Sequence, residues 1–143
     1  IPGHGMNTGG KYDFDFGSVR AVAAMHSSSL PDGSYGGNPM GYVIHAREST
    51  FYLAGDTGLT MDMKLIPLMS PPLDFAVLPI GGNYTMEYTD VPLAAEFLHC
   101  RTIVGCHFDT FEVIKIDHDK VLDFFNKNRI TGHLMAIGET KEI

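Results

Sequence analysis

Long apolar runs and targeting signals are missing from this sequence. None of its apolar stretches approaches the roughly 20 residues that a helix needs to cross a bilayer, so we expect no membrane span. Residues 1–10 are rich in turn-forming residues and have neither the basic start nor the apolar centre of a signal peptide. Since the chain also starts at Ile1 instead of a methionine, we interpret it as a piece of a longer polypeptide.

Basic residues are scarce as well. The sequence has 10 lysines and arginines against 17 aspartates and glutamates, which gives a formal net charge of −7 at pH 7. Proteins that bind nucleic acids usually present a basic face, so this balance argues against a nucleic-acid partner. The glycine-rich stretches lack the Lys-Ser or Lys-Thr pair of a phosphate-binding loop, which argues against nucleotides. A small-molecule substrate that is neutral, or neutralised locally, fits this charge better.

Only two cysteines are present, and they form no Cys-x-x-Cys pair. Cys100 and Cys106 flank one predicted short strand, which holds their Cα atoms farther apart than the roughly 7 Å that a disulfide tolerates. We therefore expect two reduced thiols and a cytoplasmic protein. Cys106 directly precedes His107, so its thiol either lines a site or serves as a small apolar group at a strand end.

The rest of the composition is that of an ordinary globular protein. Its residues are 44% hydrophobic and 19% charged, and the length suits a single domain over residues 1–143. Runs of β-branched and aromatic residues predict strands, and apolar residues at helical spacing predict helices. The expected strands are residues 14–24 (one strand or two), 41–45, 50–54, 75–80, 103–106 and 134–137, and the expected helices are residues 61–69, 89–98 and 117–128. This alternation predicts a layered α/β fold.

Three residues of metal-ligand type follow apolar runs at predicted strand ends. They are His26 in AMHSSS, Asp56 in LAGDTG and His107 in GCHFDT. Loops at strand ends are where α/β enzymes hold their functional side chains. Two imidazoles and a carboxylate suit zinc, manganese or iron, but a dinuclear site needs further ligands from elsewhere. Taken singly, either histidine is better explained by a core or capping role, and Asp56 by a turn.

Polar residues on the same loops are candidates for a supporting role. The hydroxyls of Ser27, Ser28 and Thr57 adjoin the ligand types and could orient them or hold a substrate oxygen. The amides of Asn38 and Asn83 lie on glycine-rich loops and could donate to a developing oxyanion. Backbone hydrogen bonding in tight turns explains all of them equally well.

The other histidines and the methionines carry weaker signals. His4 lies between glycines and could approach the site, whereas four histidines fit surface or helix-terminal positions: His45, His99, His118 and His133. Six further residues either form an apolar wall around a substrate or pack in the core: Met61, Met63, Met69, Met86, Tyr84 and Phe108.

Taken in order, the segments AMHSSS, DGSYGGNPMGYVI, FYLAGDTGLTMDMKLI, LDFAVLPIGGNYTM and TIVGCHFDTF resemble the C-terminal portion of the metallo-β-lactamase superfamily. The resemblance is nearest to the bacterial group described as metal-dependent hydrolases, which is related to ascorbate-phosphate lactonases and N-acylphosphatidylethanolamine phospholipases. It implies an αββα sandwich of which this chain is the C-terminal half, because the HxHxDH motif of the N-terminal half does not occur here. The missing half would then be supplied in cis or in trans.

The resemblance also implies a role for each ligand type. His26 resembles the third histidine of the first metal, Asp56 the carboxylate that bridges both metals, and His107 the last histidine of the second metal. Two divalent ions, zinc or manganese with iron as a further option, would generate a bridging hydroxide. This hydroxide would attack an ester, lactone, amide or phosphodiester bond, so no serine or cysteine nucleophile is needed.

Two other classes of function stay open on the sequence alone. A partial domain exposes the sheet face that its other half should cover, so it could be a noncatalytic interaction module or a homo-oligomer. A di-iron redox centre is the second alternative, since related folds host such centres and Asp56 suits both. Metal content separates a catalytic assembly from a binding module.

Overall fold

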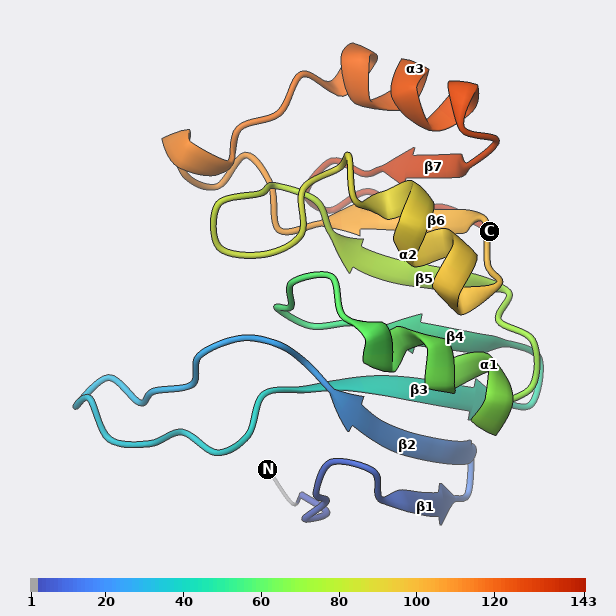
Figure 1. The fold of residues 1–143 in the computed structure, drawn as a ribbon. Helices are drawn as coiled ribbons and strands as arrows, with labels where there is room; N and C mark the ends of the chain where they lie inside the picture. The colour runs from blue at the N-terminus through green and yellow to red at the C-terminus, as the bar shows by residue number, and fades with distance from the viewer. Residues whose placement is uncertain (1–2) are drawn as a thin grey trace.

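The computed structural model describes residues 3–143, which form one mixed sheet with helices packed on one of its faces (Figure 1). Seven strands of this part of the chain follow one another across the sheet in sequence order. They are β1 (Lys11–Phe14), β2 (Gly17–Ala23), β3 (Met40–Ala46), β4 (Thr50–Leu53), β5 (Phe75–Pro79), β6 (Thr102–Cys106) and β7 (Thr131–Leu134). The first four strands pair antiparallel, and β4 to β7 pair parallel.

The crossovers between the parallel strands contain the helices. They are η1 (Met61–Leu65) with α1 (Ile66–Met69), α2 (Val91–Leu98), and η2 (Glu112–Ile114) with α3 (His118–Lys127). Asp117, the first residue of the expected helix, caps α3, because its carboxylate accepts from the backbone N–H of Lys120. Asp90 begins α2 without a side-chain cap, since its carboxylate accepts from the N–H of Glu87 instead.

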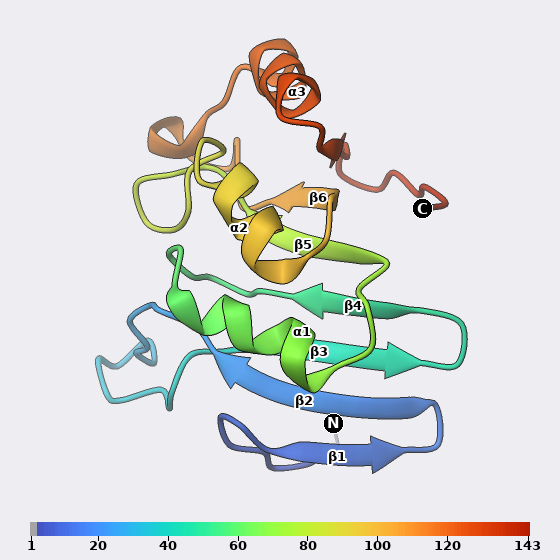
Figure 2. The same ribbon diagram turned by 45° about the vertical axis from the view of Figure 1, so that its right-hand side comes forward.

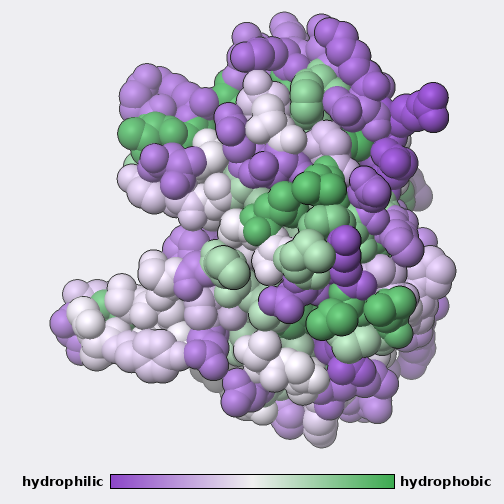
Figure 3. Space-filling view, in the orientation of Figure 1, coloured by the Kyte–Doolittle hydropathy of each residue, from purple (hydrophilic) through white to green (hydrophobic). Residues whose placement is uncertain are grey.

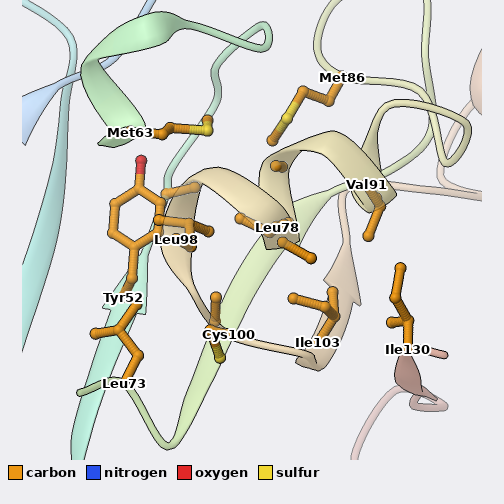
Figure 4. Packing of buried hydrophobic residues seen from close by; sticks show 14 of the residues in the cluster. Tyr52, Met63, Leu73, Leu78, Met86, Val91, Leu98, Cys100, Ile103 and Ile130 are labelled. Carbon is orange, nitrogen blue, oxygen red and sulfur yellow. The ribbon is translucent and has the colours of Figure 1, made fainter. Parts of the chain in front are cut away.

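One face of the sheet makes the hydrophobic core with these helices. Every second side chain of a strand points to this face. Tyr52 of β4, Leu78 of β5 and Ile103 of β6 are fully buried there. Figure 4 shows Met63 and Leu98 of the helical layer packed over them. Each large apolar side chain that is fully buried in this way contributes about 1.5–3 kcal/mol. Helix α3 belongs to the same face, because the ring of Phe125 fills the space where Gly132 of β7 has no side chain.

The opposite face of the sheet is also apolar but only half-buried. Cross-strand register places Ile44, Phe51 and Phe75 side by side on it, and Val77 pairs with Val104 farther along. The rings of Phe51 and Phe75 stack with their centroids 4.9 Å apart. Within residues 3–143, the helices that pack on the sheet lie on the other face (Figure 2). We call the face that carries these residues the open face.

Two expected strands differ from those observed. The segment over residues 14–24 is resolved into the hairpin β1–β2, and the first strand starts earlier, at Lys11. The last strand, predicted at residues 134–137, is instead Thr131–Leu134, in parallel register with β6. The apolar sequence at 134–137 misled the prediction, since Ile137 is fully exposed. Gly132 enables the earlier strand by leaving room for Phe125.

Of the two roles left open for the methionines, a substrate wall or the core, the structure confirms the core for two of them. Met63 and Met86 are each only 1% exposed and pack in the core. Met61 and Met69 are exposed, and Figure 3 shows that apolar surface lies over the helical layer.

No helix within residues 3–143 combines the length and apolarity that a bilayer crossing requires.

Candidate metal centre

The three expected ligands come from one edge of the sheet. Strands β2, β4, β5 and β6 all run in the same direction, so their C-terminal ends meet at the edge on the left of Figure 1. His26, Asp56 and His107 follow β2, β4 and β6. Figure 3 shows that this edge is indented between two projecting lobes. Ligand sites of α/β sheets lie at such an edge, where loops from different strands converge.

Asp56 and His107 are brought together, although 51 positions separate them in the sequence. Nε2 of His107 lies 3.6 Å from Oδ2 of Asp56, and the two side chains are 25% and 52% exposed. This separation is longer than an ordinary hydrogen bond. The other ring nitrogen of His107, Nδ1, is buried and has no hydrogen-bond partner among residues 3–143. Nε2 of His107 and Oδ2 of Asp56 therefore lie close together without forming a direct hydrogen bond.

A tight turn after β5 supports His107. A Cβ atom on Gly81 would lie 2.3 Å from the carbonyl oxygen of His107, so only glycine fits there. The N–H of Ile80 donates to the carbonyl of Cys106 at 3.0 Å, which extends the pairing of β5 and β6 up to the site. His107 itself has a left-handed backbone, with φ of 54°. A non-glycine residue in this conformation is held by its surroundings.

Thr57 joins the loops that carry His26 and Asp56. Its side chain is fully buried, accepts from the N–H of Met25 at 2.9 Å and donates to the carbonyl of Gly58 at 2.8 Å. The N–H of Gly58 donates back to the carbonyl of Met25, and the carbonyl of Thr57 accepts from Met86 on the loop after β5. Thr57 thus ties together the loops that follow three strands.

His26 is oriented but does not join the pair. Its Nδ1 lies 2.7 Å from the carbonyl of Ser27, so Nδ1 carries the proton and Nε2 keeps its lone pair in the neutral ring. Across residues 3–143, no three or more His, Cys, Asp or Glu side chains are close enough to hold a metal ion. The structure therefore brings together Asp56 and His107, while the role of His26 as a ligand stays a prediction.

The other supporting candidates serve their own loops in this structure. The amide oxygen of Asn38 accepts from the hydroxyl of Tyr35, and the carbonyl of Ser28 accepts from the N–H of Gly36. Asn83 is exposed in a left-handed turn, with φ of 58°. Ser27 is exposed, and its carbonyl is the acceptor for His26. Their part in a reaction remains a prediction.

Both cysteines are free thiols, as expected. Burial raises the pKa of Cys106 to about 11, and the nearby charge of Asp56 adds to the shift. Both effects disfavour the thiolate form of Cys106 at neutral pH. Cys100 is buried, and its pKa is raised chiefly by desolvation.

Sequence reasoning did not find an aspartate–histidine pair next to His107. Oδ2 of Asp109 and Nε2 of His118 are 2.6 Å apart, and Oδ1 of Asp109 accepts from the N–H of Ile116. The hydrogen bond from Ile116, with smaller contributions from His118, lowers the pKa of the Asp109 carboxyl. His118 is exposed at the start of α3, as predicted, but nothing in its sequence position indicates this partner.

The remaining histidines divide between confirmed and corrected predictions. His99 ends α2 and is exposed, and His45 is exposed on β3, where it bonds the hydroxyl of Thr50. His133 was expected at the surface or at a helix end, which is wrong: it lies half-buried on β7, and its Nδ1 is buried. His4 packs on the ring of Tyr12 with centroids 3.8 Å apart, so it is engaged at β1.

The mixed sheet with helices on one face agrees with the metallo-β-lactamase fold, which a solved structure of a protein of that superfamily from Thermotoga maritima shares with this chain at a TM-score of 0.63 and 21% identity. The chain belongs to the family described as the beta-lactamase superfamily domain, which matches residues 1–116.

Individual proteins agree with this assignment. A metal-dependent hydrolase from Christiangramia forsetii is 52% identical over 98% of this chain and 62% of its own length. A second one, from Flavobacterium johnsoniae, is also 52% identical, with the same coverage of 98% and 62%. Among solved structures, a metallo hydrolase from Ignicoccus hospitalis has a TM-score of 0.80 and 31% identity, over 95% of this chain and 58% of that one. The chain thus spans about three-fifths of the length of these relatives.

Proposed function

We propose that the complete protein is a metal-dependent hydrolase that cleaves an ester, lactone, amide or phosphodiester bond. The observation that carries the proposal is the 3.6 Å separation of Asp56 Oδ2 and His107 Nε2 at the C-terminal edge of the sheet. The relatives named as metal-dependent hydrolases support the same class of activity.

The pair fits a divalent cation. Two ligands that each lie about 2.0–2.2 Å from one tetrahedral cation are about 3.4 Å apart. The observed 3.6 Å is close to this value and too long for a direct hydrogen bond. Imidazole nitrogen and carboxylate oxygen together suit zinc or manganese, and also iron. We propose two such ions in the complete site.

Each ligand-type residue has a separate task. The carboxylate of Asp56 and Nε2 of His107 would hold the cations. Nε2 of His26 would be a further ligand, because its Nδ1 donates to the carbonyl of Ser27. When bound, the two cations would lower the pKa of a shared water and supply a nucleophile at neutral pH. Thr57 would keep the His26 and Asp56 loops in register during the reaction.

The remaining ligands would come from a further segment of the whole protein. The relatives are longer than this chain, which spans 62% of the first of them. The open face, with Phe51 stacked on Phe75, is an apolar surface that a second layer would cover. We propose that an N-terminal half, in cis or as a separate chain, covers the open face and completes the site. We also propose a cytoplasmic location, which the two free thiols support.

The test compares metal content and turnover in the full-length protein. Asp56→Asn keeps the size of the side chain and removes the charge that faces two cations. We expect the wild type to bind close to two metals per chain and to hydrolyse at least one of a panel of lactone, ester, amide and phosphodiester substrates. The variant should lose at least one metal and most of the turnover while remaining folded. Asp15→Asn, an exposed aspartate in the β1–β2 turn, is the matched control.

A noncatalytic interaction module is the second candidate. It is favoured by the open face and by the finding that His26 joins no group of three ligands within residues 3–143. Full-length protein that binds no zinc, manganese or iron would establish this candidate and exclude the hydrolase.

A further inference from the structure

A cavity of about 630 Å³ adjoins the candidate metal centre. It lies between the segment that leaves β6, residues 105–110, and the segment that follows β7, residues 135–137. His107 lines this cavity and also lies 3.6 Å from Asp56, so it is shared by the cavity and the candidate metal centre. Its volume is within the range of about 300–1,000 Å³ that is usual for sites that bind small molecules.

The wall of the cavity is largely apolar and includes two histidines, His107 and His118. Phe108 and Met135, together with the exposed Ala136 and Ile137, supply its apolar part, so the cavity is open to solvent on that side. None of the described residues that line it is a lysine or an arginine. An anionic group bound there would meet the carboxylate of Asp109 on a wall that has no lysine or arginine, whereas a neutral group would bury apolar surface.

His118 is the directional group of this wall. Its Nε2 donates to Oδ2 of Asp109 at 2.6 Å, and Oδ1 of Asp109 is held by the N–H of Ile116 at 3.0 Å. The ring of Phe108 meets the imidazole edge-on at 5.4 Å between centroids, which restricts its rotation. Because Nε2 carries the proton, Nδ1 of the neutral ring is an acceptor. Within residues 3–143, the imidazole of His118 forms its hydrogen bond through Nε2 and none through Nδ1.

We infer that this cavity binds the substituent next to the scissile bond, and that it selects a small, neutral, mainly apolar group with one hydroxyl or amide N–H, which donates to His118. Asp109 is a positioning residue that fixes the ring of His118. The inference rests on the proposed hydrolase function, because it places the scissile bond at Asp56 and His107.

The first experiment measures kcat/KM of the metal-loaded full-length protein for three p-nitrophenyl esters. Their acyl groups are butyryl, 3-hydroxybutyryl and succinyl, which are apolar, donor-bearing and anionic in turn. We expect the 3-hydroxybutyryl ester to be the best substrate and the succinyl ester the poorest. His118→Ala should lower kcat/KM for the 3-hydroxybutyryl ester by about tenfold and leave the butyryl ester within about twofold. His99→Ala, at the exposed end of α2, is the control. An equal loss on both esters, or none, would overturn the role of His118.

The second experiment does not depend on turnover. Full-length protein labelled with ¹³C-methyl methionine is titrated with 4-hydroxypentan-2-one, pentan-2-one and 4-oxopentanoate, which are ketones and cannot be hydrolysed. The methyl resonance of Met135, assigned through Met135→Leu, should shift most with 4-hydroxypentan-2-one and least with 4-oxopentanoate. His118→Ala should weaken the former response, and the exposed Met61 should not respond. Inactivity on the whole panel of ester, lactone, amide and phosphodiester substrates, with an intact Met135 response, would reject the hydrolase and keep the cavity as a binding site. Lack of a selective Met135 shift would reject the cavity.

Discussion

The backbone N–H of Met25 donates to the side-chain hydroxyl of Thr57 at 2.9 Å, across 32 residues of sequence. This bond joins the loop that carries His26 to the loop that carries Asp56, and the Thr57 side chain that accepts it is fully buried. The relative placement of two candidate ligands is therefore supported by a hydroxyl group that binds no metal itself, together with the bond from the N–H of Gly58 to the carbonyl of Met25.

Replacing this hydroxyl tests its role. Thr57→Val has nearly the same shape but leaves the N–H of Met25 without its acceptor, so we expect a loss of about 1–3 kcal/mol in the free energy of unfolding. Metal affinity in the full-length protein should fall as well, because the His26 loop is released. Urea unfolding and metal titration measure the two effects. Thr57→Ser, which keeps the hydroxyl, should retain most of the metal affinity, and equal losses in both variants would contradict the explanation.

Gly81 sets the position of His107 by steric contact. Gly81→Ala places a methyl group 2.3 Å from the carbonyl oxygen of His107, so the turn or the His107 loop must shift. Forced shifts of this kind cost about 1–3 kcal/mol. We expect lower thermal stability together with weaker metal binding by the full-length protein. Gly5→Ala is the control, since nothing lies within 4 Å of its added Cβ. Unchanged metal affinity in Gly81→Ala would show that this contact does not position the ligand.

The open face predicts the behaviour of the isolated chain. Without a covering layer, residues 1–143 should self-associate at micromolar concentration and show no hydrolase activity. Phe75→Gln removes one of the two stacked rings and should reduce self-association in light scattering. Leu68→Gln, at a 78% exposed position on the helical face, should not. Adding the remaining segment of the full-length protein should restore a monodisperse species with activity. A monodisperse, active isolated chain with two bound metals would overturn this prediction.

His133 makes stability depend on pH. Burial, with a smaller effect of Lys141, lowers its pKa below the ordinary 6.5, so the folded state disfavours the protonated ring. Below pH 6.5 the unfolded chain binds more protons at this position than the folded chain does, and stability falls as the pH falls. Well above pH 6.5 the ring is neutral in both states, and the contribution of His133 to the free energy of unfolding is fully present. His133→Gln should flatten this part of the stability curve in urea unfolding between pH 5 and 7, whereas His99→Ala should leave it unchanged.

Much of the fold could be predicted because its signals are local. Continuous apolar runs such as 75–80 and 103–106 predicted β5 and β6 within one or two residues, and Asp117 marked the start of α3. The last strand was misplaced because the apolar run at 134–137 has the same local pattern as a buried strand. Which of two adjacent segments pairs with β6 depends on whether Phe125 can pack over Gly132, and that contact is tertiary.

The sequence by itself determined the types of candidate ligands and their position directly after strands, because side-chain chemistry and strand periodicity are local properties. That these strands run in the same direction, so that His26, Asp56 and His107 meet at one edge of the sheet, became known only from the structure. Only the tertiary structure decided that Asp56 and His107 stand 3.6 Å apart, that His26 does not join them, and that Asp109 holds His118. These relationships follow from strand register and from the packing of loops far apart in the chain, which short-range sequence patterns do not encode.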